Sequence, residues 1–414
     1  MKLFQQMLVA GASLSLITPL VAQASDVNIE EMNSYSRSSK SSNKQFDSKT
    51  FSNEIANANE RVDGIESRLN EFEAGGFSDT TVLDGKAIFD VGSVDTDDDT
   101  YTGETQFMYT YTLNLNTSFT GDDNLYTRIK TGNHSSWSKT KSVYNTYLSS
   151  GNGNEDALEV DKLWYTTPVG DSNHTVTFGP KIENYYMHAT TPSIYQPVLK
   201  SFTLGGNAAG YGASTSPGVG WAYTADNGFA MSSNITSKNP VFTDEAKQSW
   251  ATQIGYTQPN YSVSALVNMK YNGWTDSYFM TTDGKARPGD KNSTNVGLRA
   301  WWRPTDAETA VPSISVGYDT SETDASSNSN TTAYFVGLNW TDVFNADDKI
   351  GLAFGQPQMV EGETIEPFLY ELYYKYKVND SISVTPTIFG GTSKNSSDVE
   401  TDMTGYLLQT TFKF

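Results

Sequence analysis

Cysteine is absent from the 414 residues of this chain. The absence excludes disulfides, thiolate metal sites and cysteine nucleophiles, as well as a lipid attached to an N-terminal cysteine. Histidine is nearly as scarce: only His134, His174 and His188 occur, and they are too scattered to suggest a metal site. We therefore expect neither a metal nor a cofactor.

Basic residues are also scarce, with 28 Lys and Arg against 48 Asp and Glu, which gives a formal net charge of −20. A protein that binds nucleic acid needs a cationic face for the phosphates, so nucleic acid is not an expected partner. Aromatic residues are abundant by contrast, with 24 Tyr and 20 Phe. This mixture of polar and aromatic residues is unusual for a soluble enzyme.

The first 24 residues have the pattern of a signal peptide. Lys2 supplies a positive charge, residues 7–22 are mostly apolar, and Ala22-Gln23-Ala24 fits a cleavage site after Ala24. A membrane anchor is the weaker interpretation, because the stretch is short for a helix that must span ~20 residues. No later run approaches that length, so a membrane location would require strands.

Two short segments follow the signal peptide. Residues 25–50 are rich in serine and predict a periplasmic linker that cannot bury enough apolar surface to fold. Residues 51–76 predict a coiled-coil helix, because apolar residues alternate at spacings of four and three. The alternative is an amphipathic helix that lies on its own domain. The predicted seam consists of Phe51, Ile55, Ala58, Val62, Ile65, Leu69 and Phe72.

From residue 81 to residue 414 the hydrophobic period is two. Residues 106–119, 261–271, 368–378 and 404–414 alternate apolar and polar side chains most clearly. Sixteen segments have strand character. They are 82–94, 105–120, 125–133, 158–168, 174–182, 218–225, 228–236, 249–258, 261–271, 293–303, 312–320, 332–340, 348–356, 366–378, 381–390 and 404–414.

The connections between these segments distinguish a barrel from a soluble sandwich. Short turns such as 121–124 and 258–260 alternate with long polar insertions such as 134–157 and 183–217. Outer-membrane barrels have this alternation, and they also carry aromatic girdles at both interfaces. Trp302 and Tyr376 lie beside short turns, whereas Tyr318 lies near a long loop. We predict a 16-stranded antiparallel transmembrane β-barrel over residues 81–414, in contact with outer-membrane lipid and lipopolysaccharide.

The chain resembles cyanobacterial outer-membrane porins of the Som type, which are related to the carbohydrate-selective OprB porins. The stretches that carry the resemblance are LNLNTSFTGDD (113–123) followed by Arg128, LWY (163–165), PVGD (168–171), PSISVGY (312–318), GLAFGQP (351–357), ELYYK (371–375), NDSISVTP (379–386), TFKF (411–414) and VNIEEMN (27–33). The resemblance implies a trimeric channel for small solutes and inorganic ions, including iron or carbohydrate. It also implies that Phe414 is a signal read by the barrel-assembly machinery. A surface-layer-homology module that grips the cell wall is usual in that family, whereas a serine-rich linker stands at that place in this chain.

The inward-facing residues of such a barrel decide which solutes pass. Alternation along the strands predicts that the following charged residues face inward: Lys86, Arg128, Lys130, Lys181, Arg299, Arg303, Glu371 and Lys375. This lining is more basic than acidic, so we expect it to favour anions or to select weakly. The alternative is that these charges are paired to acidic groups and merely keep the interior wet.

The loop over residues 183–217 is the longest insertion, and it has few charges and several aromatic residues. A solvated loop would be more polar, so we expect this one to fold inward and narrow the pore, where Lys200 would add a cation. No histidine has an evident nucleophile beside it, so we do not expect an enzyme. The predicted function is passive diffusion of small hydrophilic solutes. The alternative is a barrel that serves mainly as a structural anchor in the envelope.

Overall fold

The computed structural model describes residues 80–98, 103–134, 137, 145–206, 208–241, 243–274, 281, 292–305, 311–324, 329–394 and 399–414. The predicted signal peptide, linker and coiled-coil helix lie outside these ranges and stay predictions. Among the described residues, no helix is long and apolar enough to cross a membrane.

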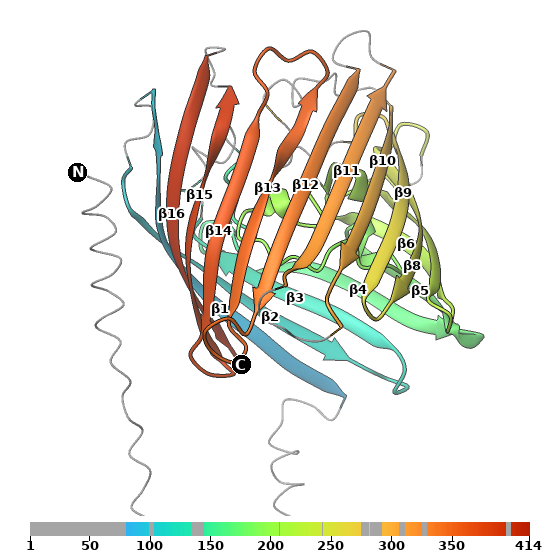
Figure 1. The fold of residues 1–414 in the computed structure, drawn as a ribbon. Helices are drawn as coiled ribbons and strands as arrows, with labels where there is room; N and C mark the ends of the chain where they lie inside the picture. Colours follow the sequence, from blue (N-terminus) through green and yellow to red (C-terminus); the bar gives the residue numbers. More distant parts are fainter. Residues whose placement is uncertain are drawn as a thin grey trace, which may run out of the picture. The chain divides into compact units, whose positions relative to one another are not determined.

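Sixteen antiparallel strands close into a barrel, because each strand pairs with its neighbours in the chain and β1 pairs with β16 (Figure 1). The predicted strand number and topology are therefore confirmed. The strands are β1 (Thr81–Thr96), β2 (Gln106–Thr117), β3 (Asn124–Gly132), β4 (Glu159–Val169), β5 (Asp171–Ile182), β6 (Ser216–Thr224), β7 (Phe229–Ser237), β8 (Gln248–Gln258), β9 (Tyr261–Tyr271), β10 (Ser293–Trp302), β11 (Ser313–Thr323), β12 (Asn330–Thr341), β13 (Lys349–Val360), β14 (Phe368–Lys377), β15 (Ile382–Lys394) and β16 (Glu400–Lys413).

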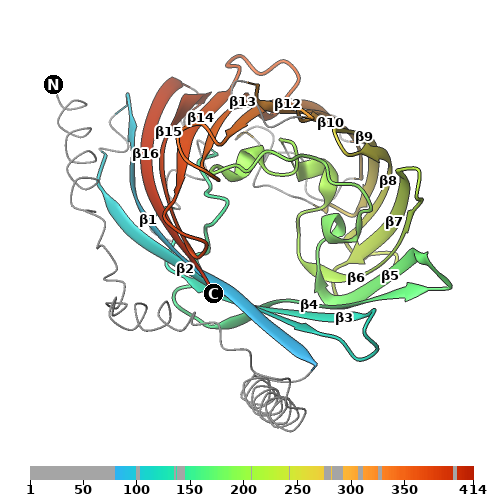
Figure 2. The ribbon, with the colours of Figure 1, turned by 60° about the horizontal axis from the view of Figure 1, so that its bottom comes forward.

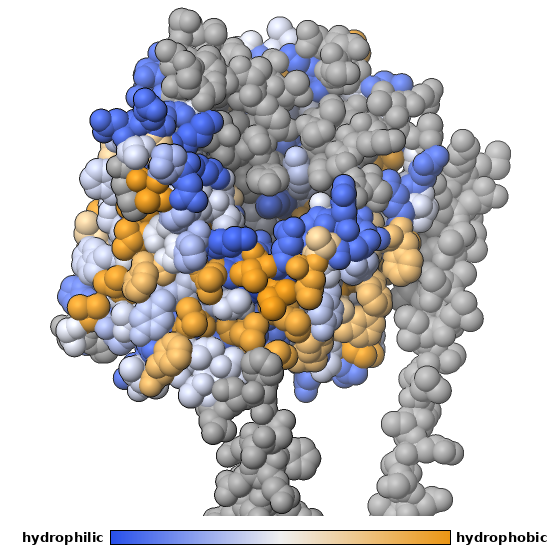
Figure 3. Space-filling view, turned by 180° about the vertical axis from the view of Figure 1, so that it is seen from behind, coloured by the Kyte–Doolittle hydropathy of each residue, from blue (hydrophilic) through white to orange (hydrophobic). Residues whose placement is uncertain are grey.

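The outer face of the barrel is apolar, and the inner face is polar except where loops pack against it, as period-two alternation predicts. In β9, Tyr261, Val263 and Val267 are exposed on the outside, whereas Ser262 and Asn268 are buried inside. Figure 3 shows apolar side chains gathered over the outer wall, with hydrophilic side chains above them. Closing the sheet also pairs the backbone groups of every strand, which a hydrocarbon environment demands.

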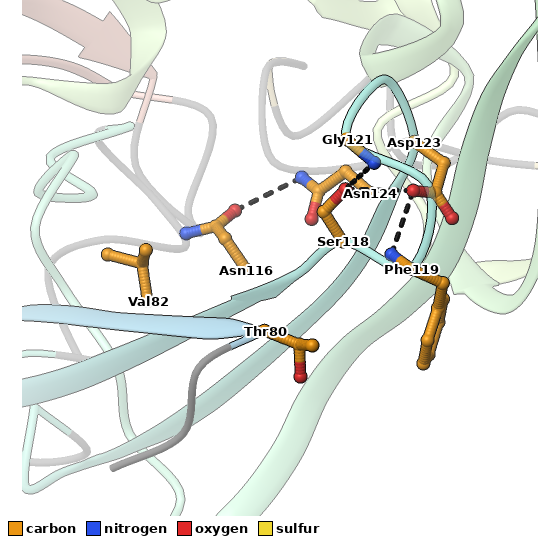
Figure 4. Close-up of a pocket in the computed structure, with 8 residues that line it drawn as sticks. All are labelled: Thr80, Val82, Asn116, Ser118, Phe119, Gly121, Asp123 and Asn124. Carbon is orange, nitrogen blue, oxygen red and sulfur yellow. Dashed lines mark hydrogen bonds between the residues drawn. The ribbon is translucent and has the colours of Figure 1, made fainter. Parts of the chain in front are cut away.

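Two of the short turns are built in the same way around an aspartate. Asp123 Oδ1 accepts hydrogen bonds from the backbone N–H groups of Phe119 (2.9 Å) and Thr120 (2.8 Å), and its Oδ2 accepts one from the Tyr165 hydroxyl (2.7 Å). Figure 4 shows this turn, with Gly121 at its tip. The tip needs glycine because its φ is +95°.

Asp348 repeats the arrangement in the turn between β12 and β13. It accepts hydrogen bonds from the N–H groups of Val343 (2.7 Å) and Phe344 (3.0 Å) and from the Tyr374 hydroxyl (2.8 Å). Partial desolvation raises the pKa of Asp123 and Asp348, but the donated hydrogen bonds outweigh it and hold both pKa values below the usual range. Both turns therefore depend on an ionised carboxylate.

Three 3-10 helices lie in the long connection between β5 and β6. They are η1 (Asn184–Met187), η2 (Lys200–Phe202) and η3 (Ala208–Tyr211). η1 contacts β6, β7 and β8, η3 contacts β9, β10 and β11, and η2 contacts β13. The connection therefore follows the barrel wall over half of its circumference, and Figure 2 shows it inside the barrel.

Candidate functional site: the barrel interior

The loop between β5 and β6, residues 183–215, lies inside the barrel as its composition predicts. Its Tyr195, Leu199 and Phe202 are almost fully buried, and they pack in one cluster with Phe335 and Tyr373 of the strands. The ring of Phe335 lies 5.6 Å from that of Tyr195 and 5.7 Å from that of Phe202. A small hydrophobic core inside the barrel therefore holds the loop against the wall.

Glu371 of β14 binds the middle of this loop. Its carboxylate accepts hydrogen bonds from the backbone N–H of Leu199 (2.6 Å), the backbone N–H of Val198 (3.1 Å) and the Tyr195 hydroxyl (2.9 Å). Glu371 is fully buried. It therefore positions the loop and does not face passing solute, in contrast to the predicted pore-lining role.

Arg299 of β10 binds the next part of the loop. Its Nη2 contacts both oxygens of Asp319 (2.8 and 3.0 Å), and its Nε and Nη2 donate to the carbonyls of Leu204 (2.7 Å) and Gly206 (2.9 Å). Leu204, Gly205 and Gly206 all have positive φ, which turns these carbonyls toward the guanidinium. A Cβ on Gly206 would overlap Phe335, so only glycine fits there. Arg299 is 3 % exposed and likewise positions the loop instead of lining the pore.

Polar contacts hold the start of the loop. Asn184 donates to the Asn234 side chain (2.7 Å) and to the Ser249 carbonyl (2.9 Å), and it accepts from Thr236 (2.8 Å). His188 Nδ1 lies 3.1 Å from the Ser232 hydroxyl. Burial lowers the pKa of His188 to about 3, so its ring stays neutral.

A second loop, between β3 and β4, also enters the barrel. His134 Nε2 and the Ser150 hydroxyl lie 2.9 and 3.0 Å from Asp90 Oδ2, and Gln409 donates to Asp90 Oδ1 (2.9 Å). Leu148 of this loop forms a β-bridge with Leu199 of the first loop. The two loops together cover the inner faces of most strands.

The inner wall of β3 and β4 keeps accessible side chains. Arg128 and Asp161 form an ion pair, with an Arg128 Nε to Asp161 Oδ2 distance of 2.6 Å, and their side chains are 20 % and 29 % exposed. Three half-buried aromatic rings form a row, two on this wall and one in η1 of the loop: Tyr126 and Trp164 lie 4.4 Å apart, and Trp164 and Tyr186 lie 4.7 Å apart. We call Tyr126, Trp164 and Tyr186 the aromatic ladder. Arg128 Nη1 donates to the Tyr186 hydroxyl (3.1 Å) and so joins ladder and ion pair.

The other predicted lining residues lie in different parts of the barrel. Lys86, Lys130 and Lys375 lie on the inner face and are half-buried or exposed, and Lys200 lies in η2 of the inward loop. Arg303 follows the end of β10, and its Nε donates to the Pro259 carbonyl of the next short turn (2.6 Å). It therefore lies at the short-turn rim of the barrel.

Lys181 lies on the outer face, where simple alternation places an inward residue. The register pairs Tyr165 with Phe178 and Leu163 with Lys181. These partners are two residues apart on β4 but three apart on β5, so β5 has one extra residue at this point. A bulge of this kind reverses the facing of every residue beyond it. The Nζ of Lys181 donates to the Val160 carbonyl at the edge of the strand (2.7 Å).

Sequence reasoning missed the aromatic ladder and both anchoring partners, Asp319 and Asp90. Tyr126 and Trp164 lie on strands, and LWY at 163–165 is apolar on both faces, so the signal was an aromatic residue on a face expected to be polar; Tyr186 lies in η1 of the loop. Asp319 and Asp90 had no local signal, because their partners are about 20 and 44 residues away in the chain. Among the described residues, no group of His, Asp or Glu is placed to hold a metal ion.

Comparisons with known proteins agree with this geometry. Residues 41–389 match the carbohydrate-selective porin family OprB. An uncharacterized protein of Nostoc sp. strain PCC 7120 is 25% identical over 88% of this chain and 70% of its own length. The high-pH structure of Pseudomonas putida OprB has a TM-score of 0.60 and 12% identity, covering 83% of this chain and 97% of that one.

A mutant of Rh. blastica porin shares the fold more distantly. It has a TM-score of 0.52 and 11% identity, and it covers 81% of this chain and 100% of that one. At these identities the structures show the common barrel fold alone, whereas the family match extends over most of the chain. A closed barrel with an apolar outside, two loops folded within it and this match lead to one conclusion: the chain belongs to the carbohydrate-selective OprB porin family and is an outer-membrane channel protein.

Proposed function

We propose that the chain forms a water-filled channel for the passive diffusion of small hydrophilic solutes, including carbohydrates and inorganic ions such as iron. The observation that carries this proposal is that the inward loops cover part of the inner wall and leave another part accessible to water. The inward loops bury Glu371 and Arg299, whereas Arg128 and Asp161 stay accessible beside them. A polar wall that water reaches, next to a loop that reduces the cross-section, filters solutes by size and charge without chemistry.

The aromatic ladder favours carbohydrate among these solutes. Tyr126, Trp164 and Tyr186 present consecutive ring faces, and the Arg128–Asp161 pair lies beside them. The apolar face of a sugar ring packs on an aromatic ring, while charged side chains exchange hydrogen bonds with its hydroxyls. The ladder and the ion pair would therefore guide a sugar along β3 and β4.

Conductance in planar bilayers tests the channel. We expect the refolded chain to insert in discrete steps and maltose to reduce the ion current. Trp164→Ala should weaken that reduction by about tenfold in maltose concentration, since loss of a stacked aromatic ring costs on the order of 1 kcal/mol. Trp302→Ala on the outer face is the matched control. Steps with equal maltose sensitivity in both variants would contradict the role of the ladder.

A folded barrel that gives no steps would instead support the alternative of a structural anchor between the outer membrane and the envelope. The remaining parts of the proposal concern assembly. We expect export through a signal peptide cleaved after Ala24, contact with lipopolysaccharide at the long-loop end, and insertion by the barrel-assembly machinery. We also expect a homotrimer, as the resemblance to Som-type porins implies. The predicted coiled coil of residues 51–76 spans only three heptads, so contacts between the barrels would have to hold the chains together.

A further inference from the structure

Four lysines face the inside of the barrel as two directly opposed pairs. Lys86 of β1 is the register partner of Lys413 of β16, and Lys349 of β13 is the partner of Lys375 of β14. Residues opposite each other in an antiparallel pair share a face, and like charges in that position repel. We call these four residues the lysine cluster.

The inward orientation of the cluster follows from its neighbours on each strand. Lys86 lies on the face of Asp90, which contacts His134 of the loop between β3 and β4. Lys413 lies on the face of Gln409, which donates to Asp90, and Lys375 lies on the face of Glu371. Lys86 and Lys413 are exposed, whereas Lys349 and Lys375 are half-buried.

The two pairs form one region of positive charge. The charge of Lys375 interacts with those of Lys413, Lys349 and Lys86, and the charge of Lys86 also interacts with that of Arg128. Lys375 follows Glu371 by four residues, which places it about 13 Å further along β14 toward the short turns. A solute that has passed the inward loop therefore meets the cluster next.

The acidic groups nearby are already bound elsewhere. Asp347 accepts from Lys377 (2.7 Å), Asp84 accepts from Asn114 (2.7 Å), and Asp161 accepts from Arg128. Within the described residues, no lysine of the cluster forms an ion pair or a side-chain hydrogen bond. The buried cations Arg299 and Lys162 differ from the lysine cluster in this respect. Arg299 forms an ion pair with Asp319, and Lys162 forms one with Glu183.

We infer that the lysine cluster is a binding site for small multivalent oxyanions, such as phosphate esters or polycarboxylates, on their way through the channel. Four ammonium groups in a confined space bounded by low-dielectric walls attract anions strongly, and an anion with several charges contacts more than one lysine at once. This inference rests on the proposed channel function and names one class of solute for it. Asp347 and Asp342 offset part of the charge of Lys349, but Asp347 is paired with Lys377 and Asp342 accepts from the Asp347 N–H (2.6 Å). A multivalent anion would offset the repulsion within both pairs at once.

The test compares the wild-type chain with the variant Lys86→Gln/Lys349→Gln/Lys375→Gln/Lys413→Gln in planar bilayers. In a potassium chloride gradient the wild type should be selective for anions, and the variant should lose most of that selectivity. Added pyrophosphate should reduce the wild-type chloride current. The variant should need at least about tenfold more pyrophosphate, because the loss of even one hydrogen bond between charged groups has that effect.

Lys377→Gln is the matched control, because Lys377 lies on the same face of β14 but is paired with Asp347 and Asp380. It should keep the wild-type pyrophosphate sensitivity. Equal sensitivity of the wild type and the fourfold variant, or a wild-type channel selective for cations, would overturn the inference and leave the channel function standing.

Calorimetric binding of pyrophosphate and citrate to the folded protein in detergent separates the two proposals. Binding that the fourfold variant loses, in a protein that gives no conductance, would overturn the channel function and keep the site. Binding of pyrophosphate but not citrate would restrict the class to phosphates, whereas binding of neither would overturn the site. A heat-induced shift in gel mobility confirms that each variant forms a barrel.

Discussion

Glu371 illustrates how one side chain organises the inside of this barrel. Its carboxylate receives two backbone N–H groups and one hydroxyl from a segment more than 170 residues away in the chain. Glu371 is fully buried, so water could not satisfy its carboxylate if one of these donors were lost. A carboxylate is suited to this position because it only accepts hydrogen bonds and has two oxygens to receive them.

Glu371→Gln should therefore destabilise the folded chain by about 1–3 kcal/mol, since the amide nitrogen cannot accept and one backbone donor loses its partner. Urea unfolding of the protein in lipid vesicles measures the change. Glu400→Gln, at an exposed position of β16, is the control and should have little effect. Equal stability of Glu371→Gln and the wild type would show that the carboxylate does not hold the loop.

The turn carboxylates Asp123 and Asp348 should make stability depend on pH. Their pKa values are lower in the folded chain than the ordinary value near 4, so the unfolded chain binds more protons around that pH. The stabilisation is therefore complete above about pH 5 and is lost as the pH falls through 4 and below.

Asp123→Asn/Asp348→Asn should lower the urea midpoint at pH 7, and its difference from the wild type should narrow at pH 3. Asp122→Asn, at the exposed residue beside Asp123, is the matched control. An equal difference at both pH values would contradict the role of the ionised carboxylates.

At the scale of elements, the inward loop behaves as part of the wall. Its apolar residues complete a core with Phe335 and Tyr373, and its backbone is bound at Glu371 and Arg299. A loop held in this way reduces the cross-section of the channel permanently, because releasing it would expose the core and two charged groups at once. The extra residue in β5 moves Lys181 to the outer face, and it shifts the register of β5 with both β4 and β6.

Deleting residues 186–200 should raise the single-channel conductance, because much of the inward loop between β5 and β6 is then removed from the channel. The increase should be several-fold if the loop sets the narrowest cross-section. Shortening the connection 361–367, between β13 and β14, is the control and should leave the conductance nearly unchanged. Unchanged conductance after the 186–200 deletion, in a protein with barrel-like gel mobility, would show that the constriction lies elsewhere.

At the scale of the whole molecule, the two ends of the barrel sequence meet. The carbonyl of Phe414 accepts from the Gly85 N–H (2.8 Å), the N–H of Phe414 donates to the Gly85 carbonyl (3.2 Å), and its ring stacks on Tyr111 at 5.8 Å. The last residue of the chain therefore takes part in joining β16 to β1. The contact closes the sheet and leaves no strand edge.

Deleting Phe414 should reduce the amount of folded protein in the outer membrane, because this residue takes part in closing the sheet and is the proposed signal for the assembly machinery. Quantifying the heat-shifted band in membrane fractions measures the loss. Phe414→Tyr keeps the ring and the backbone contacts and should assemble at close to the wild-type level. Normal assembly of the deletion would contradict the proposed signal.

The sequence alone determined the barrel. Period-two alternation, sixteen segments and the sequence of short and long connections are local properties, and a closed sheet in a membrane is their only consistent arrangement. The inward loop also followed from local composition. Which inner charges meet solute depends instead on the folded barrel. Burial of Arg299 and Glu371, the register pairs of the lysine cluster and the bulge before Lys181 depend on contacts between residues far apart in the chain, which alternation within one strand does not encode.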